Sequence, residues 1–299
     1  MLNITLRQIR YFDALAKHGH FGRAANACSI SQPALSVQIR ELEEALGAIL
    51  FERGARQVRL TIVGEGLVSR VRDILSTVDE LGNLARAIGG KTFARLRIGI
   101  IPTIAPYLLP TLIQKLTTIN PTLDLHVRET LTSKLLRELT DGRLDAAILA
   151  LPISEPAFTE VALFDEDFVL VRPAADADQP VPDREQLNQM RLLLLEEGHC
   201  FRDQALSFCK LPHEGLDGSS LTTLVQMVAS GLGVTLIPEM AVDVETRLAS
   251  VSVARFENPM AARTIGMIWR KTNPLAEQLM QIAEVVKQSA ETLREPHES

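Results

Sequence analysis

The N-terminal fold of this 299-residue chain is predicted first from Phe21–Arg53, FGRAANACSISQPALSVQIRELEEALGAILFER. The second half of this stretch predicts an amphipathic helix, because apolar residues follow one another at spacings of 4, 3 and 4: Leu35, Ile39, Leu42 and Leu46. Ser31 is a good N-cap for this helix, Pro33 is tolerated in its first turn, and Gly47 ends it.

Two shorter helices are predicted before this one. The first has an apolar stripe that stops near Gly19: Leu6, Ile9, Phe12, Leu15 and Ala16. The second follows from Phe21 and turns the small side chains of Ala24 and Ala25 inward, so that another helix can approach closely. Cys28 beside them is interpreted as core rather than as chemistry. Together the three helices form a helix-turn-helix pattern, whose third helix enters the DNA major groove with its N-terminus first.

Polar residues gather at that end of the third helix, and a predicted β-hairpin, FERGARQVRLT, follows it with Arg59 and two further arginines. Arginine matches phosphate oxygens bidentately, so the hairpin suits a wing that grips the DNA backbone. The alternative for the polar residues of the third helix is a solvated face without a DNA contact, which any amphipathic helix has. The predicted DNA-binding residues are Ser31, Gln32, Pro33, Ser36, Gln38, Arg40, Arg53 and Arg56.

A long helix is predicted from a cap at Thr61 to about Ile88. Its apolar positions alternate at spacings of 4 and 3, which is the a/d seam of a coiled coil: Leu67, Val71, Ile74, Val78, Leu81, Ala85 and Ile88. The alternative is packing against its own domain. Gly89 and Gly90 then end the helix and begin a hinge. A helix-turn-helix beside a coiled coil predicts a dimer that reads two half-sites.

Charge is distributed unevenly along the chain. Residues 1–97 carry 14 Lys/Arg and 9 Asp/Glu (14 − 9 = +5), and the remainder carries 17 and 28 (17 − 28 = −11), which together give the net charge of −6. This favours a basic, anion-binding domain followed by an acidic one. We expect a cytoplasmic protein, because the N-terminus lacks a signal-peptide core and no apolar run reaches the roughly 18 residues of a membrane helix. With three cysteines the chain is not a secreted disulfide framework.

From Arg95 onward, predicted strands and helices alternate, which indicates an α/β fold with mainly parallel sheets. The strands are RLRIGII, LDLHVRET, RLDAAILA, EVALFDEDFVLV, MRLLLLE, GVTLIP and RTIGMIWR; the helices are PYLLPTLIQKLTTIN, LTSKLLRELTDG, SSLTTLVQMVASG and LAEQLMQIAEVVKQ. The length favours two subdomains, with chain crossings near Asp165 and Arg263. Ligands in such folds bind at the carboxyl ends of strands, where Thr103, Thr132 and His199 are expected. Each threonine has the alternative role of a helix cap.

The stretch Glu196–Lys210, EEGHCFRDQALSFCK, holds Cys200 and Cys209 nine residues apart (209 − 200) on a predicted helix. Nine residues of helix place the sulfurs roughly 13 Å apart along the axis, whereas a disulfide needs Cα atoms within about 4.4–6.8 Å. A bond here requires the helix to unwind, as in a two-state redox switch; the alternative is inert buried packing. Arg202 and a helix N-terminus favour a thiolate, as does His199, while Asp203 opposes it. The sequence offers no four-ligand zinc spacing.

These motifs resemble, over nearly the whole chain, the LysR-type transcriptional regulators, and GHCFRDQALSFC resembles their peroxide-sensing branch. The resemblance implies a winged helix-turn-helix, a dimerising linker helix and a periplasmic-binding-protein-like effector domain, commonly in tetramers. It implies that Cys200 is the peroxidatic cysteine and Cys209 the resolving one. The peroxide pocket that it implies comprises Thr103, Thr132, His199, Asp203 and Arg263. In one departure, KLPHEGLDGS is short, so the family's second pocket histidine has no counterpart in register: Gly215 falls there, and His213 lies two residues earlier.

The domains expected from these arguments are a winged helix-turn-helix (1–60), a linker helix (61–89), a hinge (90–94) and an effector domain (95–299). The effector domain divides into subdomain I, about 95–165 and 266–299, and subdomain II, about 166–265. The expected partners are promoter DNA, RNA polymerase, further copies of the chain, hydrogen peroxide as signal and a cytosolic thiol reductant, with no cofactor, metal or membrane. The alternatives are a LysR-type regulator with a small organic effector and inert cysteines and, from another class, a thiol peroxidase. We expect an activator rather than an enzyme.

Overall fold

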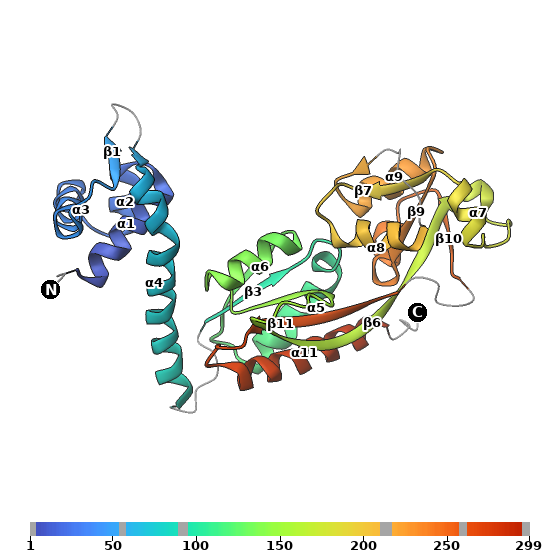
Figure 1. Cartoon of the computed structure of the whole chain (residues 1–299). Coiled ribbons are helices and arrows are strands. Elements are labelled where there is room, and N and C mark those ends of the chain that lie inside the picture. The colour runs from blue at the N-terminus through green and yellow to red at the C-terminus, as the bar shows by residue number, and fades with distance from the viewer. Residues whose placement is uncertain (1–3, 54–57, 89–94, 210–216, 257–261, 295–299) are drawn as a thin grey trace. The chain divides into compact units, whose positions relative to one another are not determined.

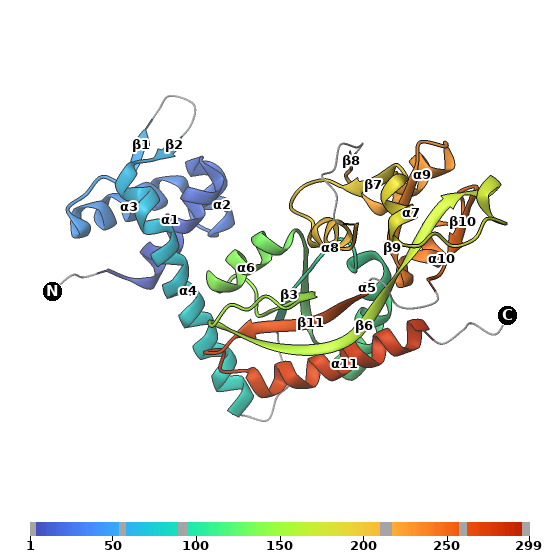
Figure 2. The same cartoon turned by 45° about the vertical axis from the view of Figure 1, so that its right-hand side comes forward.

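The computed structural model describes residues 4–53, 58–88, 95–209, 217–256 and 262–294. Its contacts divide the chain into two compact units, the first formed mainly by residues up to Ala85 and the second mainly by residues from Arg86 onward. Figures 1 and 2 show the elements of each unit. In the part of the chain described, no helix is long and apolar enough to cross a lipid bilayer.

The first unit contains the predicted helix-turn-helix and its hairpin. Its elements are α1 (Leu6–His18), α2 (Phe21–Ala27), α3 (Gln32–Leu46), β1 (Phe51–Arg53), β2 (Val58–Leu60) and α4 (Ile62–Ile88). Ser31 caps α3 by accepting a hydrogen bond from the Ala34 amide, and Gly47 ends it in the left-handed conformation, at φ 66°. β1 and β2 pair antiparallel, with Phe51 opposite Leu60. The sequence therefore predicted these elements correctly.

The core of this unit forms where the three short helices meet. Its buried residues are Phe12, Leu15, Ala24, Ala25, Leu35, Ile39, Leu42, Leu50 and Phe51. The Phe12 and Phe51 ring centroids lie 5.3 Å apart, which fastens the hairpin to α1. Glu43 accepts hydrogen bonds from the amides of Leu50 and Phe51, so the start of β1 is also tied to α3.

Helix α4 begins at its predicted cap, because the Thr61 hydroxyl accepts a hydrogen bond from the Gly64 amide. Leu67 and Val71 pack against the core of their own unit, as the alternative interpretation of the seam required. Farther along, Ile74 and Leu81 are 44% and 62% exposed. The first turns of α4 therefore stabilise the helix-turn-helix, and the later turns present apolar side chains to solvent. The side chains of Ala85 and Ile88 lie outside the described part of the chain, as does the predicted hinge.

The second unit is built on a mixed sheet with the strand order β4-β3-β5-β11-β6-β9-β7-β8, in which β10 also pairs with β6. Its strands are β3 (Arg95–Ile100), β4 (Asp124–Glu129), β5 (Ala146–Leu151), β6 (Phe158–Pro173), β7 (Leu192–Leu195), β8 (Asp217–Gly218), β9 (Val234–Pro238), β10 (Val251–Ala254) and β11 (Ala262–Arg270). Its helices are α5 (Ala105–Ile119), α6 (Thr132–Thr140), α7 (Arg184–Gln189), α8 (Cys200–Cys209), α9 (Leu221–Ala229), α10 (Val242–Glu245) and α11 (Ala276–Arg294), with 3₁₀ turns η1 (Ala174–Asp176) and η2 (Glu239–Ala241).

The predicted strands and helices of this unit are confirmed, with corrections in pairing and number. β3 pairs parallel with β4 and β5, and β7 pairs parallel with β8 and β9. The two connecting strands, β6 and β11, pair antiparallel with each other and with their neighbours, so the expectation of mainly parallel sheets was wrong at the centre. The sequence prediction also missed α7, α10, β8 and β10, which are at most six residues long.

Two hydrophobic cores lie on this sheet. One is built from β3, β5, α5, α6 and α11 around the buried Trp269, and the other from β7, β9, α9 and the second half of β6. β6 is 16 residues long and supplies Phe158 to the first core and Phe168 to the second. Figures 1 and 2 show β6 and β11 running together between the two lobes. The strands, rather than a loop, therefore carry the chain from one core to the other.

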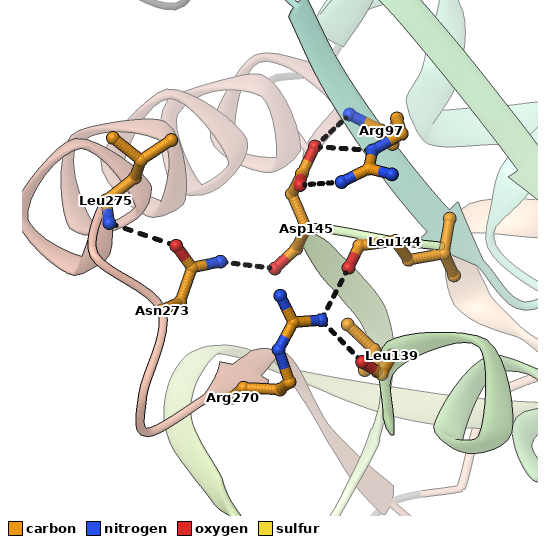
Figure 3. Close-up of polar contacts among 7 residues, drawn as sticks. All are labelled: Arg97, Leu139, Leu144, Asp145, Arg270, Asn273 and Leu275. Atoms are coloured by element: carbon orange, nitrogen blue, oxygen red, sulfur yellow. Dashed lines mark hydrogen bonds and ion pairs between the residues drawn. The ribbon is translucent and has the colours of Figure 1, made fainter. Parts of the chain in front are cut away.

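A polar network closes the outer end of the first core (Figure 3). The Asp145 carboxylate accepts hydrogen bonds from the Arg97 amide at 2.7 Å and from its guanidinium nitrogens Nε and Nη2 at 3.2 and 2.7 Å. The Asn273 amide donates to the Asp145 carbonyl, and Arg270 donates to the carbonyls of Leu139 and Leu144. Asp145 is 4% exposed, so these contacts are shielded from water.

We expect Asp145→Ala to lower the free energy of unfolding by about 2–4 kcal/mol, because it removes the carboxylate that partners a shielded guanidinium and an amide. Urea unfolding of the purified protein measures the change. Asp124→Ala is the matched control: it removes the partner of Arg95 at the solvent-exposed start of β4, where an ion pair contributes little. Equal shifts of the urea midpoint in the two variants would contradict the prediction.

Candidate functional site

Cys200 is the first residue of α8, which follows β7 after a four-residue turn. Gly198 in this turn has φ 95°, a backbone conformation that residues other than glycine rarely adopt. A Cβ at this position would lie 3.1 Å from the side chain of Leu131. The turn thus brings Cys200 beside the loop that precedes α6. Cys200 is half-buried and forms no disulfide.

Cys209 is the last residue of the same helix, so the two cysteines end one continuous α8 as predicted. At about 1.5 Å of rise per residue, the helix separates them by roughly 13 Å along its axis. The side chain of Cys209 lies outside the described part of the chain. A bond between these cysteines requires α8 to unwind.

A narrow pocket lies against Cys200, with essentially no free space for a water-sized sphere. Its lining comprises Ile101, Pro102, Thr103, Leu131, Thr132, Gly198, His199, Cys200 and Phe201. The structure therefore brings together Thr103, Thr132 and His199, which the sequence placed after three different strands. The hydroxyl oxygen of Thr132 is buried and has no hydrogen-bond partner in the described residues. Thr132 therefore does not act as a helix cap, because a capping hydroxyl accepts a hydrogen bond from a backbone amide. An orphaned hydroxyl in a pocket is suited to a small polar ligand.

Arg263 lies directly behind Thr103. Its guanidinium donates to the Thr103 hydroxyl at 2.8 Å, to the Thr103 carbonyl at 3.1 Å and to the Glu166 carboxylate at 2.7 Å. The side chains of Arg263 and Glu166 are 0% and 2% exposed. The Arg263 guanidinium also lies 5.3 Å from the ring centroid of Phe201, the residue after Cys200. A buried charge is thus fully paired and supports the pocket through Thr103.

The sequence prediction missed Glu166, although a signal for it was present. The alternation of β6 places Glu166 on the same side of the strand as Phe164 and Phe168, so an ionisable residue stands at an inward position. Asp203, which the resemblance assigned to the pocket, is exposed on α8 and does not line it. His213 and Gly215 lie outside the described residues.

Burial shifts the pKa of both His199 and Cys28. Burial lowers the pKa of His199 below its ordinary value of 6.5, against an opposing effect of Glu196, so His199 is neutral at physiological pH and serves the pocket as a dipole rather than a cation. Burial, and then the charge of Asp13, raises the pKa of Cys28, which keeps it a thiol. Cys28 is only partly buried and is not among the core residues of the first unit, so its interpretation as core is not confirmed.

A larger cavity of about 350 Å³ adjoins the pocket and shares Pro102, Thr103, Leu131 and His199 with it. Its remaining lining residues are Pro106, Tyr107, Glu129, Thr130, Leu195, Ser219, Ser220, Leu221, Thr222 and Glu245. The Tyr107 hydroxyl donates to the Glu245 carboxylate at 2.7 Å. Burial and this bond raise the pKa of Tyr107, so its hydroxyl stays protonated.

The predicted DNA-binding residues lie at the start of α3, along its first half and in the hairpin that follows. Ser31, Gln32 and Pro33 are exposed at the start of α3. The side-chain amide of Gln38 donates to Glu41 at 2.7 Å, which leaves its carbonyl oxygen for other contacts. Arg40 is exposed, and its Nε donates to the Ser36 carbonyl at 3.3 Å. The side chain of Arg53 and all of Arg56 lie outside the described residues.

No cluster of three or more His, Cys, Asp or Glu side chains suited to a metal ion occurs in the described residues.

The comparisons with known families concern the two units separately. The model described as bacterial regulatory helix-turn-helix protein, lysR family, matches residues 6–65, and the LysR substrate binding domain matches residues 90–291. The chain belongs to the LysR family. This confirms the resemblance and the fold class that the sequence predicted.

Relatives within the LysR family extend over nearly the full chain. The Escherichia coli DNA-binding transcriptional dual regulator OxyR is 42% identical over 293 residues, which cover 95% of each protein. A full-length cysteine-to-aspartate variant of OxyR from Pseudomonas aeruginosa has a TM-score of 0.77 at 41% identity and 95% coverage of both chains. A cysteine-to-serine variant of Corynebacterium glutamicum OxyR with bound hydrogen peroxide has a TM-score of 0.68 at 35% identity, covering 97% of this chain and 94% of that one.

The lowered pKa of His199 predicts a pH-dependent stability. The unfolded chain binds a proton near pH 6.5, where the folded chain does not, so the contribution of neutral His199 is complete above that pH and is lost as pH falls through the lower folded value. We expect the thermal midpoint of the wild type to fall toward that of His199→Gln between about pH 7 and 5. A midpoint difference that does not change with pH would contradict this.

Proposed function

We propose that this chain is a DNA-binding transcriptional regulator of the oxidative-stress response, which senses hydrogen peroxide by reversible formation of a Cys200–Cys209 disulfide. The observation that carries the proposal is the position of Cys200: at the start of an intact helix that ends at Cys209, in a pocket with an orphaned Thr132 hydroxyl. The LysR family membership supports it, as do a relative named probable hydrogen peroxide-inducible genes activator and the OxyR structure with bound hydrogen peroxide.

The first chemical step is oxidation of Cys200. Its thiolate sulfur attacks one peroxide oxygen, the O–O bond breaks, and hydroxide leaves and takes up a proton to become water. The product is a sulfenic acid at Cys200. Thr103 and Thr132 offer hydroxyl groups to the peroxide oxygens, and the small pocket excludes bulky ligands.

The second step forms the disulfide. The Cys209 sulfur attacks the sulfenic sulfur, a second hydroxide leaves and is protonated, and the sum is two thiols and one peroxide giving one disulfide and two waters. Because the helix separates the cysteines, α8 must unwind for this bond. Unwinding withdraws Phe201, 2% exposed, from the second core and from Arg263. A cytosolic dithiol reductant reverses the bond.

We propose that remodelling of α8 changes how effector domains pack in a dimer or tetramer. This in turn changes the spacing of the paired DNA-binding domains on a promoter, and with it the contact with RNA polymerase. The exposed Ile74 and Leu81 on α4 support a dimer contact through the second half of the predicted seam. We propose the domain division given by the sequence, with subdomain I on the first core and subdomain II on the second. We also propose that the protein acts in the cytoplasm.

A second candidate is a regulator whose effector is a small organic molecule. The 350 Å³ cavity favours it, because that cavity has room for such a ligand and offers hydroxyl and carboxylate groups. The two candidates differ in their dependence on Cys200: substitution by serine abolishes a peroxide response but preserves an effector response. A thiol peroxidase would show sustained turnover with added reductant, whereas we propose stoichiometric oxidation.

We expect a stoichiometric peroxide pulse, followed by alkylation and intact-mass analysis, to give loss of two hydrogens in a Cys200–Cys209 peptide. Cys28→Ser should react like the wild type, since burial keeps Cys28 a thiol. Cys209→Ser should stop at the sulfenic acid of Cys200 and lose the reversible switch in promoter binding. If both cysteines remain alkylatable in the wild type after the pulse, the proposed switch is wrong.

Gln32→Ala should weaken binding to a specific promoter by about 1–3 kcal/mol, because it removes a side chain placed to read base edges at the start of α3. Electrophoretic mobility shift at fixed salt measures the change against a scrambled DNA. Glu44→Gln, at the exposed far end of the same helix, is the matched control and should not reduce specific affinity. An unaltered ratio of specific to scrambled affinity in Gln32→Ala would count against this orientation of α3.

A further inference from the structure

Glu166 is linked to the Cys200 pocket through Arg263, which bonds to Thr103 in the pocket lining. Its Oε2 accepts from Arg263 Nε at 2.7 Å and lies 2.6 Å from Nη2, and its Oε1 accepts from the Met240 amide at 3.3 Å. A carboxylate has only acceptors and a guanidinium only donors, so every hydrogen bond between the two runs from Arg263 to Glu166. Glu166 therefore fixes the plane of the guanidinium from the side away from the pocket.

The other edge of the same guanidinium fixes Thr103. Arg263 Nη1 donates to the Thr103 hydroxyl oxygen at 2.8 Å, and Nη2 donates to its carbonyl at 3.1 Å. Because a guanidinium accepts no hydrogen bond, the Thr103 hydroxyl hydrogen must point elsewhere. Thr103 is 3% exposed and lines the pocket with Cys200 as well as the larger cavity, so a peroxide held at Cys200 would offer that hydrogen an acceptor.

We propose that Glu166 is a positioning residue for the oxidation of Cys200: through Arg263 it holds the Thr103 hydroxyl as a donor to a peroxide oxygen. The inference rests on the proposed function. As the sulfur–oxygen bond forms and the O–O bond breaks, negative charge grows on the departing hydroxide, which takes its proton from solvent. A fixed donor stabilises that charge more than it stabilises the bound peroxide, so it accelerates the step.

The charge of Glu166 has a second consequence at this site. It neutralises a guanidinium that lies 5.3 Å from the ring centroid of Phe201, the residue next to Cys200. The pocket therefore contains an oriented hydroxyl rather than an unpaired cation, and an unpaired cation would attract anions in preference to neutral hydrogen peroxide. The competing explanation is that the pair only holds β6 to β11, in which case every reaction of Cys200 would change together.

The test compares two reactions of Cys200 in the full-length protein. Its oxidation by hydrogen peroxide is followed by quenched alkylation and intact mass, and its alkylation by iodoacetamide reports general access to the thiol. We expect Glu166→Gln to slow oxidation by about tenfold or more, the effect of losing one well-placed hydrogen bond, and to leave alkylation within about twofold of the wild type. Asp165→Asn, an exposed carboxylate one residue earlier on β6, should change neither rate.

A double-substitution cycle separates positioning from structure. In a Thr103→Val background, Glu166→Gln should have no further effect on oxidation, because the hydroxyl through which it acts is absent. If Glu166→Gln does not fold, Glu166→Asp takes its place: the charge is kept, the shorter side chain draws Arg263 back, and a loss of about threefold is expected, again silent in Thr103→Val. Wild-type oxidation rates in the folded Glu166 variants, parallel losses in both reactions, or a full effect in the valine background would overturn the inference.

The outcomes also separate this inference from the proposed function. A wild-type protein whose Cys200 resists a stoichiometric peroxide pulse would overturn the proposed function and this inference with it. Oxidation of the wild type together with an indifferent Glu166→Gln would overturn only the role of Glu166.

Discussion

The buried ion pair between Arg263 and Glu166 is the interaction on which the geometry of the effector unit depends. It joins the two strands that run between both cores, and both side chains are withdrawn from water. Two charges in such a place are tolerated only when their hydrogen-bonding groups are satisfied, and Thr103 and the Met240 amide complete that set. Removing one member leaves an uncompensated charge, so the arrangement resists gradual change.

This rigidity contrasts with α8. A ten-residue helix is marginal in isolation, so α8 is held by its surroundings rather than by its own hydrogen bonds. Phe201 and Ala205 anchor it in the second core, and Arg202 donates to the Leu195 carbonyl and pairs with Asp217. A fixed pocket beside a short helix with few anchors is the combination that a covalent switch needs: one part selects the oxidant and the other changes shape.

Helix α4 has two roles in the N-terminal unit. The first turns of α4 cover the core beneath α1 and α3, and the later turns carry Ile74 and Leu81 into solvent. Because α4 is uninterrupted, a partner that covers Ile74 and Leu81 would also stabilise the turns of α4 that pack on the helix-turn-helix. The seven-residue repeat predicts apolar side chains available to a partner. Its first two members, Leu67 and Val71, instead pack against the core of their own unit.

Local periodicity and fixed helix geometry are enough to predict the helix-turn-helix, the α/β character of the second unit and the spacing conflict between Cys200 and Cys209. The sequence placed Thr103, Thr132 and His199 at strand ends, but not their distances. The three-dimensional fold was needed to show that they line one pocket, that Asp203 does not line it, that β6 and β11 are antiparallel and that Glu166 pairs with Arg263. Those facts depend on contacts between residues up to 160 positions apart, such as Arg263 and Thr103, which no local pattern encodes.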